Sequence, residues 1–247
     1  KVPERRDPGP LPTRTHPRRV LLLAGCVQPA MMPGIDAATL RVLDAIGVQG
    51  VFSPQAGCCG AIRHHLNDAE GGLADARRNI DAWFPMIESG EVEALLINAS
   101  GCGAMIKDYP HLLRHDPAYA ERARRVGEAM VDLAQWLPRE FAAAHRANPG
   151  LLRRLPTRDV VFHPPCTLQH GQQVRGEVEA FLGGLGVLVQ PVADAHLCCG
   201  SAGTYSVLQP VLSKSLRERK LANLQAGGPA MILSANIGCI GHLQAGT

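Results

Sequence analysis

Short apolar runs alternate along the chain with segments in which apolar residues recur at helical spacing. The apolar runs rich in Val, Ile and Leu predict strands at residues 19–24, 48–53, 94–98, 160–163, 187–192 and 231–234. Helical spacing predicts helices at residues 36–46, 70–88, 174–185 and 206–224. Strands that alternate with helices are typical of parallel sheets covered by helices. The pattern therefore predicts an α/β fold.

The same pattern divides the chain into four segments. Residues 1–18 are rich in Pro and Arg, lack periodicity, and are interpreted as a linker or arm. Residues 19–115 form a first unit of strands and helices, and residues 158–247 form a second. Between them, residues 116–157 carry periodic Ala, Val, Leu and Met, which predicts a mostly helical connector that braces the two units.

Composition narrows the class of protein. Hydrophobic residues make up 46% and charged residues 19%, as in ordinary globular proteins. Aromatic residues are only 4%, so the core must consist mainly of Leu, Val, Ile and Ala. A net charge of +3 without a basic stripe argues against nucleic-acid binding. The chain starts without Met and ends soon after a cysteine, so we expect it to be a piece of a longer protein.

Eight cysteines carry the candidate chemistry and fall into two matching sets. The first set is Cys26, Cys58, Cys59 and Cys102, and the second is Cys166, Cys198, Cys199 and Cys239. The spacing from the first cysteine to the doublet is the same in both sets, and Gly follows each doublet. This order indicates an internal duplication. The expected fold is thus two pseudo-repeated three-layer half-domains with parallel sheets, and every cysteine follows the carboxyl end of a predicted strand, where such sheets bind ligands.

Clustered thiolates are typical of zinc sites and iron–sulfur clusters. A disulfide framework fits small secreted domains better than a chain of this length without a signal peptide, and adjacent cysteines bridge each other only with strain. Zinc usually takes Cys-x-x-Cys pairs, whereas a Cys-Cys doublet suits a core with several iron atoms. The residues therefore favour iron–sulfur, with zinc as the alternative.

Three histidines lie beside the expected ligand loops. His170 and His196 fit two roles equally, either bonded to backbone groups or donating a hydrogen bond that tunes a cluster. For His163 we expect a ring satisfied by backbone groups. Met105, close to Cys102, is expected to fill the core.

Several motifs resemble a known family. They include Ala56-Gly-Cys-Cys-Gly-Ala61, Ala99-Ser-Gly-Cys-Gly-Ala104, Pro165-Cys-Thr-Leu-Gln-His170 and the stretch from His196 to Tyr205. These stretches are similar to the CCG cysteine-rich domain of heterodisulfide reductase and its relatives and, more closely, to iron–sulfur subunits of glycolate oxidase (glycolate dehydrogenase). Members of that family also carry a ferredoxin-like domain with Cys-x-x-Cys runs, which this sequence lacks, so the resemblance is to their C-terminal part.

The resemblance implies a function. It implies that the eight cysteines hold one or two clusters of the 4Fe-4S type. It further implies that the chain passes electrons from a flavin-containing glycolate oxidase subunit to a quinone or membrane acceptor, and does not itself turn over glycolate. A cytoplasmic location, or a peripheral one at the inner face of the membrane, would follow.

One departure from the family bears on the alternatives. In heterodisulfide reductase each half ends in Cys-x-x-Cys, whereas here the endings are Cys102-Gly-Ala-Met105 and Cys239-Ile-Gly-His242. His242 is therefore a candidate replacement ligand, since imidazole also binds iron. The missing fifth cysteines weigh against a noncubane cluster and against a heterodisulfide reductase-like thiol/disulfide enzyme. The third alternative is a scaffold module that binds zinc or no metal.

Overall fold

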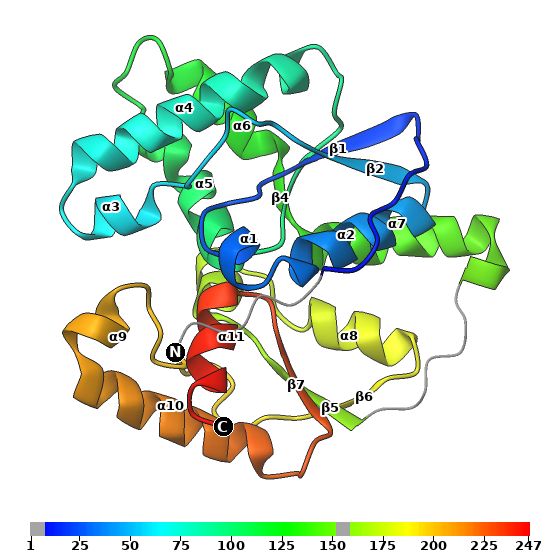
Figure 1. The fold of residues 1–247 in the computed structure, drawn as a ribbon, viewed down its shortest axis with the longest axis vertical. Coiled ribbons are helices and arrows are strands. Elements are labelled where there is room, and N and C mark those ends of the chain that lie inside the picture. The colour runs from blue at the N-terminus through cyan, green and yellow to red at the C-terminus, as the bar shows by residue number, and fades with distance from the viewer. Residues whose placement is uncertain (1–7, 152–158) are drawn as a thin grey trace.

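Two parallel β-sheets organise the protein. The computed structural model describes residues 8–151 and 159–247 (Figure 1). The first sheet has the order β2-β1-β3-β4 and the second the order β6-β5-β7. The strands are β1 (Arg18–Leu22), β2 (Val48–Phe52), β3 (Leu95–Ile97), β4 (Met130–Asp132), β5 (Asp159–His163), β6 (Leu188–Gln190) and β7 (Met231–Ser234). All pairings are parallel, as the alternation of strands and helices predicted.

Helices cover both faces of the first sheet. Its strands are apolar on both faces, so successive residues of β1 enter different cores. Leu21 packs with one group of helices and Leu22 with the other. The first group is α4 (Ala69–Glu88), α5 (Ser100–Leu112) and α6 (Ala120–Ala129), and the second is α2 (Gly34–Ala45) and α7 (Leu133–Ala147). This half therefore has the expected three layers.

The second half repeats the arrangement around β5. Val161 packs against α10 (Pro210–Gln225) and α11 (Ile237–Gln244), whereas Phe162 lies on the opposite face. That opposite face is covered by α8 (Glu177–Gly184), and Ala134 of α7 also packs there. The remaining short helices are α1 (Gln28–Met31), α3 (Ala61–His65), η1 (Pro149–Leu151), η2 (Thr167–Gly171) and α9 (Tyr205–Leu208).

The stretch between the halves packs against both of them, and it is not wholly helical. Phe141 of α7 meets Phe181 of α8 edge-on, with 5.5 Å between the ring centroids. Within the same stretch β4 adds a fourth strand to the first sheet. Three residues are too short to show a strand period, which is why the sequence did not reveal β4. Residues 152–158, with Pro156 and Thr157, lie outside the described residues.

Two other predictions about local structure were wrong. The cysteines were expected to lie in loops after the strands, yet Cys102 and Cys239 lie in the first turns of α5 and α11. The helix predicted at residues 206–224 is divided at Gln209, because Pro210 can begin a helix but not continue one. The remaining predicted strands and helices are confirmed within a few residues at their ends.

The described part of the arm is packed rather than extended away from the core. Arg41 of α2 donates hydrogen bonds to the carbonyl oxygens of Pro8 and Pro10. Arg14 and His16 both pair with Asp44, and the Arg14 hydrogen bond is the main reason that the pKa of Asp44 is lowered. Residues 1–7 of the predicted arm lie outside the described residues. Among the described helices, none is long and apolar enough to cross a membrane.

Candidate metal centres

The strand order brings the cysteines of each half to one edge of its sheet. In both sheets the strand that comes first along the chain lies between the next two. The connection after this central strand runs to one neighbour, and the next connection runs back to the other; such a reversal of strand order marks the place where parallel sheets bind ligands. Each half places its single cysteines and its doublet on the segments that follow these three strand ends. All eight cysteines are free.

In the first half the four sulfur atoms form a continuous chain of contacts. Cys26 Sγ lies 3.6 Å from Cys58 Sγ, Cys58 interacts with Cys59, and Cys59 interacts with Cys102. Hydrogen bonds from Cys26 and then Cys59 lower the pKa of Cys58, and a hydrogen bond from Cys59 lowers that of Cys102. The pKa values of Cys26 and Cys59 are raised in return. The lowered pKa values of Cys58 and Cys102 favour the thiolate, the form that binds metals.

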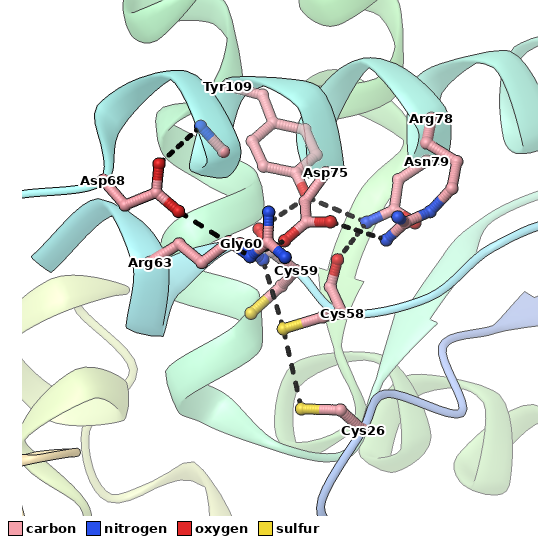
Figure 2. Close-up of polar contacts among 11 residues, drawn as sticks. Cys26, Cys58, Cys59, Gly60, Arg63, Asp68, Asp75, Arg78, Asn79 and Tyr109 are labelled. Carbon is pink, nitrogen blue, oxygen red and sulfur yellow. Dashed lines mark hydrogen bonds and ion pairs between the residues drawn. The ribbon is translucent and has the colours of Figure 1, made fainter. Parts of the chain in front are cut away.

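The first doublet is supported from behind by two side chains (Figure 2). Asn79 of α4 is fully buried, accepts from the Gly57 amide at 2.8 Å and donates to the Cys58 carbonyl at 2.8 Å. The Tyr109 hydroxyl donates to the Cys59 carbonyl at 2.9 Å and accepts from Asn79. These bonds occupy the backbone of the doublet and leave its sulfur atoms free for a ligand.

Gly60, which follows the doublet, has a positive φ of 86°. A Cβ atom there would lie 2.7 Å from the carbonyl oxygen of Gly72 in α4. Glycine is therefore required both by its conformation and by its close approach to α4. Its amide donates to Cys58 Sγ at 3.5 Å, which further favours the thiolate.

The second half contains the same chain of sulfur contacts. Cys166 interacts with Cys198, Cys198 with Cys199, and Cys199 with Cys239. The hydrogen bond from Cys199 is the main cause that lowers the pKa of Cys239 to about 5. The amide of Gly200 donates to Cys198 Sγ at 3.3 Å, as Gly60 does in the first half.

His163, the last residue of β5, is buried beside this second set. One of its ring nitrogens and the sulfur atoms of Cys199 and Cys239 all lie within 4.8 Å of one another. Neither ring nitrogen has a hydrogen-bond partner. The expectation that backbone groups satisfy this ring was therefore wrong. Spacing along the chain could not show that the end of β5 turns this ring toward the sulfur atoms.

The other candidate histidines lie around the second set. His170 and His196 are exposed, and His170 Nε2 lies 3.1 Å from the His196 carbonyl oxygen. His242 Nε2 lies 3.2 Å from Ser213 Oγ, and that hydroxyl donates to the Gly200 carbonyl. His242 is thus linked to the second doublet through Ser213. Met105 is buried in the first core, as expected.

Polar side chains connect the two cysteine sets across the junction of the halves. Asn236 donates to Cys239 Sγ at 3.5 Å and accepts from the Gly101 amide, beside Cys102, at 3.2 Å. Gln172 Nε2 donates to the Ser100 carbonyl and to Asp132 Oδ2. The two candidate centres therefore share a hydrogen-bonded boundary.

The repeated cysteine geometry has a counterpart among known domains. Residues 20–107 and 160–244 each match the CCG cysteine-rich domain. This chain belongs to the CCG family. One match lies in each half, and β4 of the first sheet falls outside both. The two matches contain all eight cysteines, so the internal duplication predicted from spacing is a duplication of the CCG domain.

The CCG chain is similar over nearly all its length to curated proteins. It is 50% identical to the glycolate oxidase iron-sulfur subunit of Escherichia coli over 95% of this chain and 56% of that protein. It is 31% identical to the probable glycolate oxidase iron-sulfur subunit of Bacillus subtilis, over 93% of this chain and 50% of that protein. It is 27% identical to lactate utilization protein A of Geobacillus thermodenitrificans, over 90% of this chain and 88% of that protein. The chain thus spans about half the length of the two glycolate oxidase subunits.

Residues that the sequence analysis did not select complete the sites. Asn79 and Asn236 stand in two further stretches that resemble the family, Asn79-Ile-Asp-Ala-Trp83 and Ala235-Asn-Ile-Gly-Cys239. The role of Asn79 depends on Gly57 and Cys58, which precede it on another element. Tyr109 and Lys220 gave no signal in the sequence. Lys220 is buried in α10, and its Nζ donates to the Asp194 carbonyl ahead of the second doublet.

Proposed function

We propose that this chain is an iron–sulfur electron carrier of a flavin-dependent glycolate or 2-hydroxy-acid oxidase. The observation that carries the proposal is the repeated chain of contacts among four sulfur atoms at the carboxyl edge of each sheet. The 50% identity to the Escherichia coli iron-sulfur subunit supports it. In this proposal each half, residues 19–115 and 158–247, holds one cluster of the 4Fe-4S type.

The donor sets suit such a group. Each half offers four thiols, and in each the pKa values of two are lowered by neighbouring thiols. Glycine amides point at Cys58 and Cys198, and amide hydrogen bonds to ligand sulfur atoms are usual around iron–sulfur clusters. The unpartnered ring nitrogens of His163 add a polar group aimed at the second set. When bound, a cluster would supply one-electron chemistry; the chain positions the thiols and donates hydrogen bonds to their sulfur atoms.

The wider role follows from the relatives' names and is part of the same proposal. A flavin-containing subunit would supply the electrons, and a quinone or membrane acceptor would receive them. This chain alone would not turn over glycolate, because the flavin that accepts electrons from the substrate would be in the partner subunit. Free cysteines fit a reducing compartment, so we place the chain in the cytoplasm or at the inner face of the membrane.

The first test is the metal content of the chain purified without oxygen. We expect iron and acid-labile sulfide in near-equal amounts, about four of each per occupied half. Without a flavin partner, the same preparation should leave glycolate unchanged. Zinc, or a folded chain with no metal, would contradict the proposal and favour a scaffold module.

Cysteine variants show which half of the chain gives the cluster signal. Cys199→Ser is expected to abolish the cluster signal of the second half, while the first half stays folded and keeps its iron. Cys59→Ser should have the reverse effect. Met105→Leu is the matched control, because this buried side chain packs in the core and a change of similar volume should leave iron unchanged. If the spectra of Cys199→Ser are the same as those of the wild type, Cys199 is not a ligand of the cluster.

A further inference from the structure

The two cysteine sets differ in the side chains that surround them. His163 lies three residues before the first cysteine of its half, and Leu23 lies at the same spacing in the first half. Leu23 is buried in the first core among apolar side chains. The folds of the two halves correspond, so this difference is one of chemistry: a ring with two nitrogen atoms replaces a hydrocarbon group.

The ring of His163 is buried against the cysteine set without another hydrogen-bond partner. The residue is only 1% exposed, and both ring nitrogens lack a partner. A buried N–H without a partner destabilises the folded state, so such groups usually have one. Cys199 and Cys239, within 4.8 Å, are the groups that a ring nitrogen can meet. Since four thiolates complete the coordination of a 4Fe-4S cluster, the ring is better placed as a hydrogen-bond donor than as a ligand.

A second difference lies behind the doublets. Lys220 is 1% exposed, and its Nζ donates to the carbonyl oxygens of Asp194 at 2.8 Å and Ala195 at 3.4 Å. At the same spacing after the first doublet stands Ile80, which is fully buried in the core. The second half therefore holds a buried ammonium group near the second doublet: burial lowers the pKa of Lys220, the charge of Cys199 raises it, and screening by solvent is weak there.

Other charges near the doublets do not offset this difference. In the first half the pKa of Cys58 is lowered mainly by Cys26 and also by Arg78, but Arg78 is exposed and paired with Asp75 at 2.9 Å. Arg63, which also pairs with Asp75, is exposed as well, so solvent screens both charges. In the second half the Arg219–Asp194 pair is exposed and screened. The groups behind the first doublet, Asn79 and Tyr109, are neutral and donate to carbonyl oxygens or to each other.

We propose that the second-half centre has the higher reduction potential of the two, because His163 donates an N–H to its sulfur atoms and Lys220 supplies a buried positive charge. This inference rests on the proposed iron–sulfur function. Adding an electron makes a cluster more negative, and both hydrogen bonds to sulfur and nearby positive charge stabilise that state. A neutral imidazole already carries one N–H, so the effect needs no change in protonation. An added electron then resides preferentially in the second half.

The test is a redox titration, followed by EPR, of chains with one functional half. Cys59→Ser leaves the second-half centre and Cys199→Ser leaves the first, and we expect the higher potential in Cys59→Ser. In the Cys59→Ser background, His163→Leu and Lys220→Met should each shift the potential downward without loss of iron or sulfide. His163→Gln keeps an N–H donor and should restore part of the shift. Thermal unfolding of each variant identifies any that is misfolded, and Lys220→Met then tests the inference independently of His163.

The outcomes separate this inference from the function on which it rests. A wild-type chain without iron and sulfide overturns the proposed function and the inference together. Iron and sulfide present with equal potentials in the two halves, or potentials unmoved by His163→Leu and Lys220→Met, overturn the inference alone. Pulsed EPR that detects a strong nitrogen coupling lost in His163→Leu would make His163 a ligand and overturn its role as a donor.

Discussion

Single side chains hold the backbone of the first cysteine doublet in place. Asn79 satisfies one amide and one carbonyl on either side of Cys58, and it also donates to Tyr109. Burial of Tyr109 raises the pKa of its hydroxyl, which keeps the proton that it donates to Cys59. Neutral donors thus fix the doublet without adding charge beside it.

Replacing Asn79 tests this support. Asn79→Ala leaves the Gly57 amide and the Cys58 carbonyl buried without partners, so we expect the free energy of unfolding to fall by about 2–4 kcal/mol. Iron bound by the first half should fall as well. The control is Asn223→Ala, which removes an exposed bond to Ala193 and should cost less than about 1 kcal/mol. Urea denaturation with metal analysis measures both effects; equal losses in the two variants would show that Asn79 gives no special support.

At the scale of elements, the doublets depend on how closely loops approach the long helices that follow. Gly60 touches α4 at Gly72, and Gly200 touches α10 at Ser213, where an added Cβ would lie 2.4 Å from a carbonyl oxygen. Both glycines have positive φ, of 86° and 91°. The Cys-Cys-Gly motif is therefore a turn packed on a helix as well as a pair of ligands.

Gly60 and Gly90 both have positive φ, but only Gly60 approaches a neighbouring helix closely. Gly90 has a φ of 72° and nothing within 4 Å of its Cβ position, so Gly90→Ala should cost about 1 kcal/mol from conformation alone. Gly60→Ala has the same conformational cost and also collides with α4. We expect it to lower the free energy of unfolding by at least about 2 kcal/mol and to reduce first-half iron. Thermal unfolding followed by circular dichroism distinguishes them, and matching values would mean that the loop moves away from α4 freely.

The whole molecule is held together by a polar junction as well as by apolar packing. Gln172 joins the Ser100 carbonyl and the Asp132 carboxylate, and a Cβ on Gly103 would lie 2.8 Å from its Nε2. Ser100 is also hydrogen-bonded to Thr167 and to the Ala235 carbonyl. The helix that carries Cys102 is thereby fixed relative to the second half (Figure 1).

Gln172→Ala tests the junction. It removes the donor from a buried carboxylate, and we expect a loss of about 2–3 kcal/mol in the free energy of unfolding at neutral pH. Burial raises the pKa of Asp132, and loss of the Gln172 hydrogen bond raises it further. When the pKa of a carboxyl group is higher in the folded state than in the unfolded state, the protein loses stability as the pH rises through that pKa. The loss in free energy of unfolding caused by Gln172→Ala should therefore be smaller in acid, where the Asp132 carboxyl group is protonated.

The control for the junction is Gln225→Ala, an exposed position at the end of α10. The free energy of unfolding of Gln225→Ala should stay within about 0.5 kcal/mol of the wild-type value at all pH values. Urea denaturation at several pH values measures both variants. If the loss in free energy of unfolding caused by Gln172→Ala does not change with pH, the contact with Asp132 is not its source.

Local patterns determined much of this protein. Strands, long helices and the duplication followed from apolar spacing and from the repeated order of eight cysteines, because these signals lie within short stretches of chain. The position of every cysteine beyond a strand end followed from the same pattern. The first turns at Cys102 and Cys239 were missed because Ser-Gly-Cys-Gly and Asn-Ile-Gly-Cys have weak helix propensity, which tertiary packing overrides.

The side chains around each cysteine set come from segments that are distant in the sequence and meet only in the folded protein. His163 meets Cys199 and Cys239, Asn79 meets the first doublet, and Asn236 joins the halves across distant parts of the sequence. These contacts depend on where separate elements pack, which spacing along one element does not specify. The order of the cysteines along the chain was enough to predict two equivalent sets of thiols. The surroundings of the sets differ because His163 of β5 and Lys220 of α10 both face inward in the second half. Among the described residues, a buried imidazole and a buried ammonium group therefore lie beside the second set.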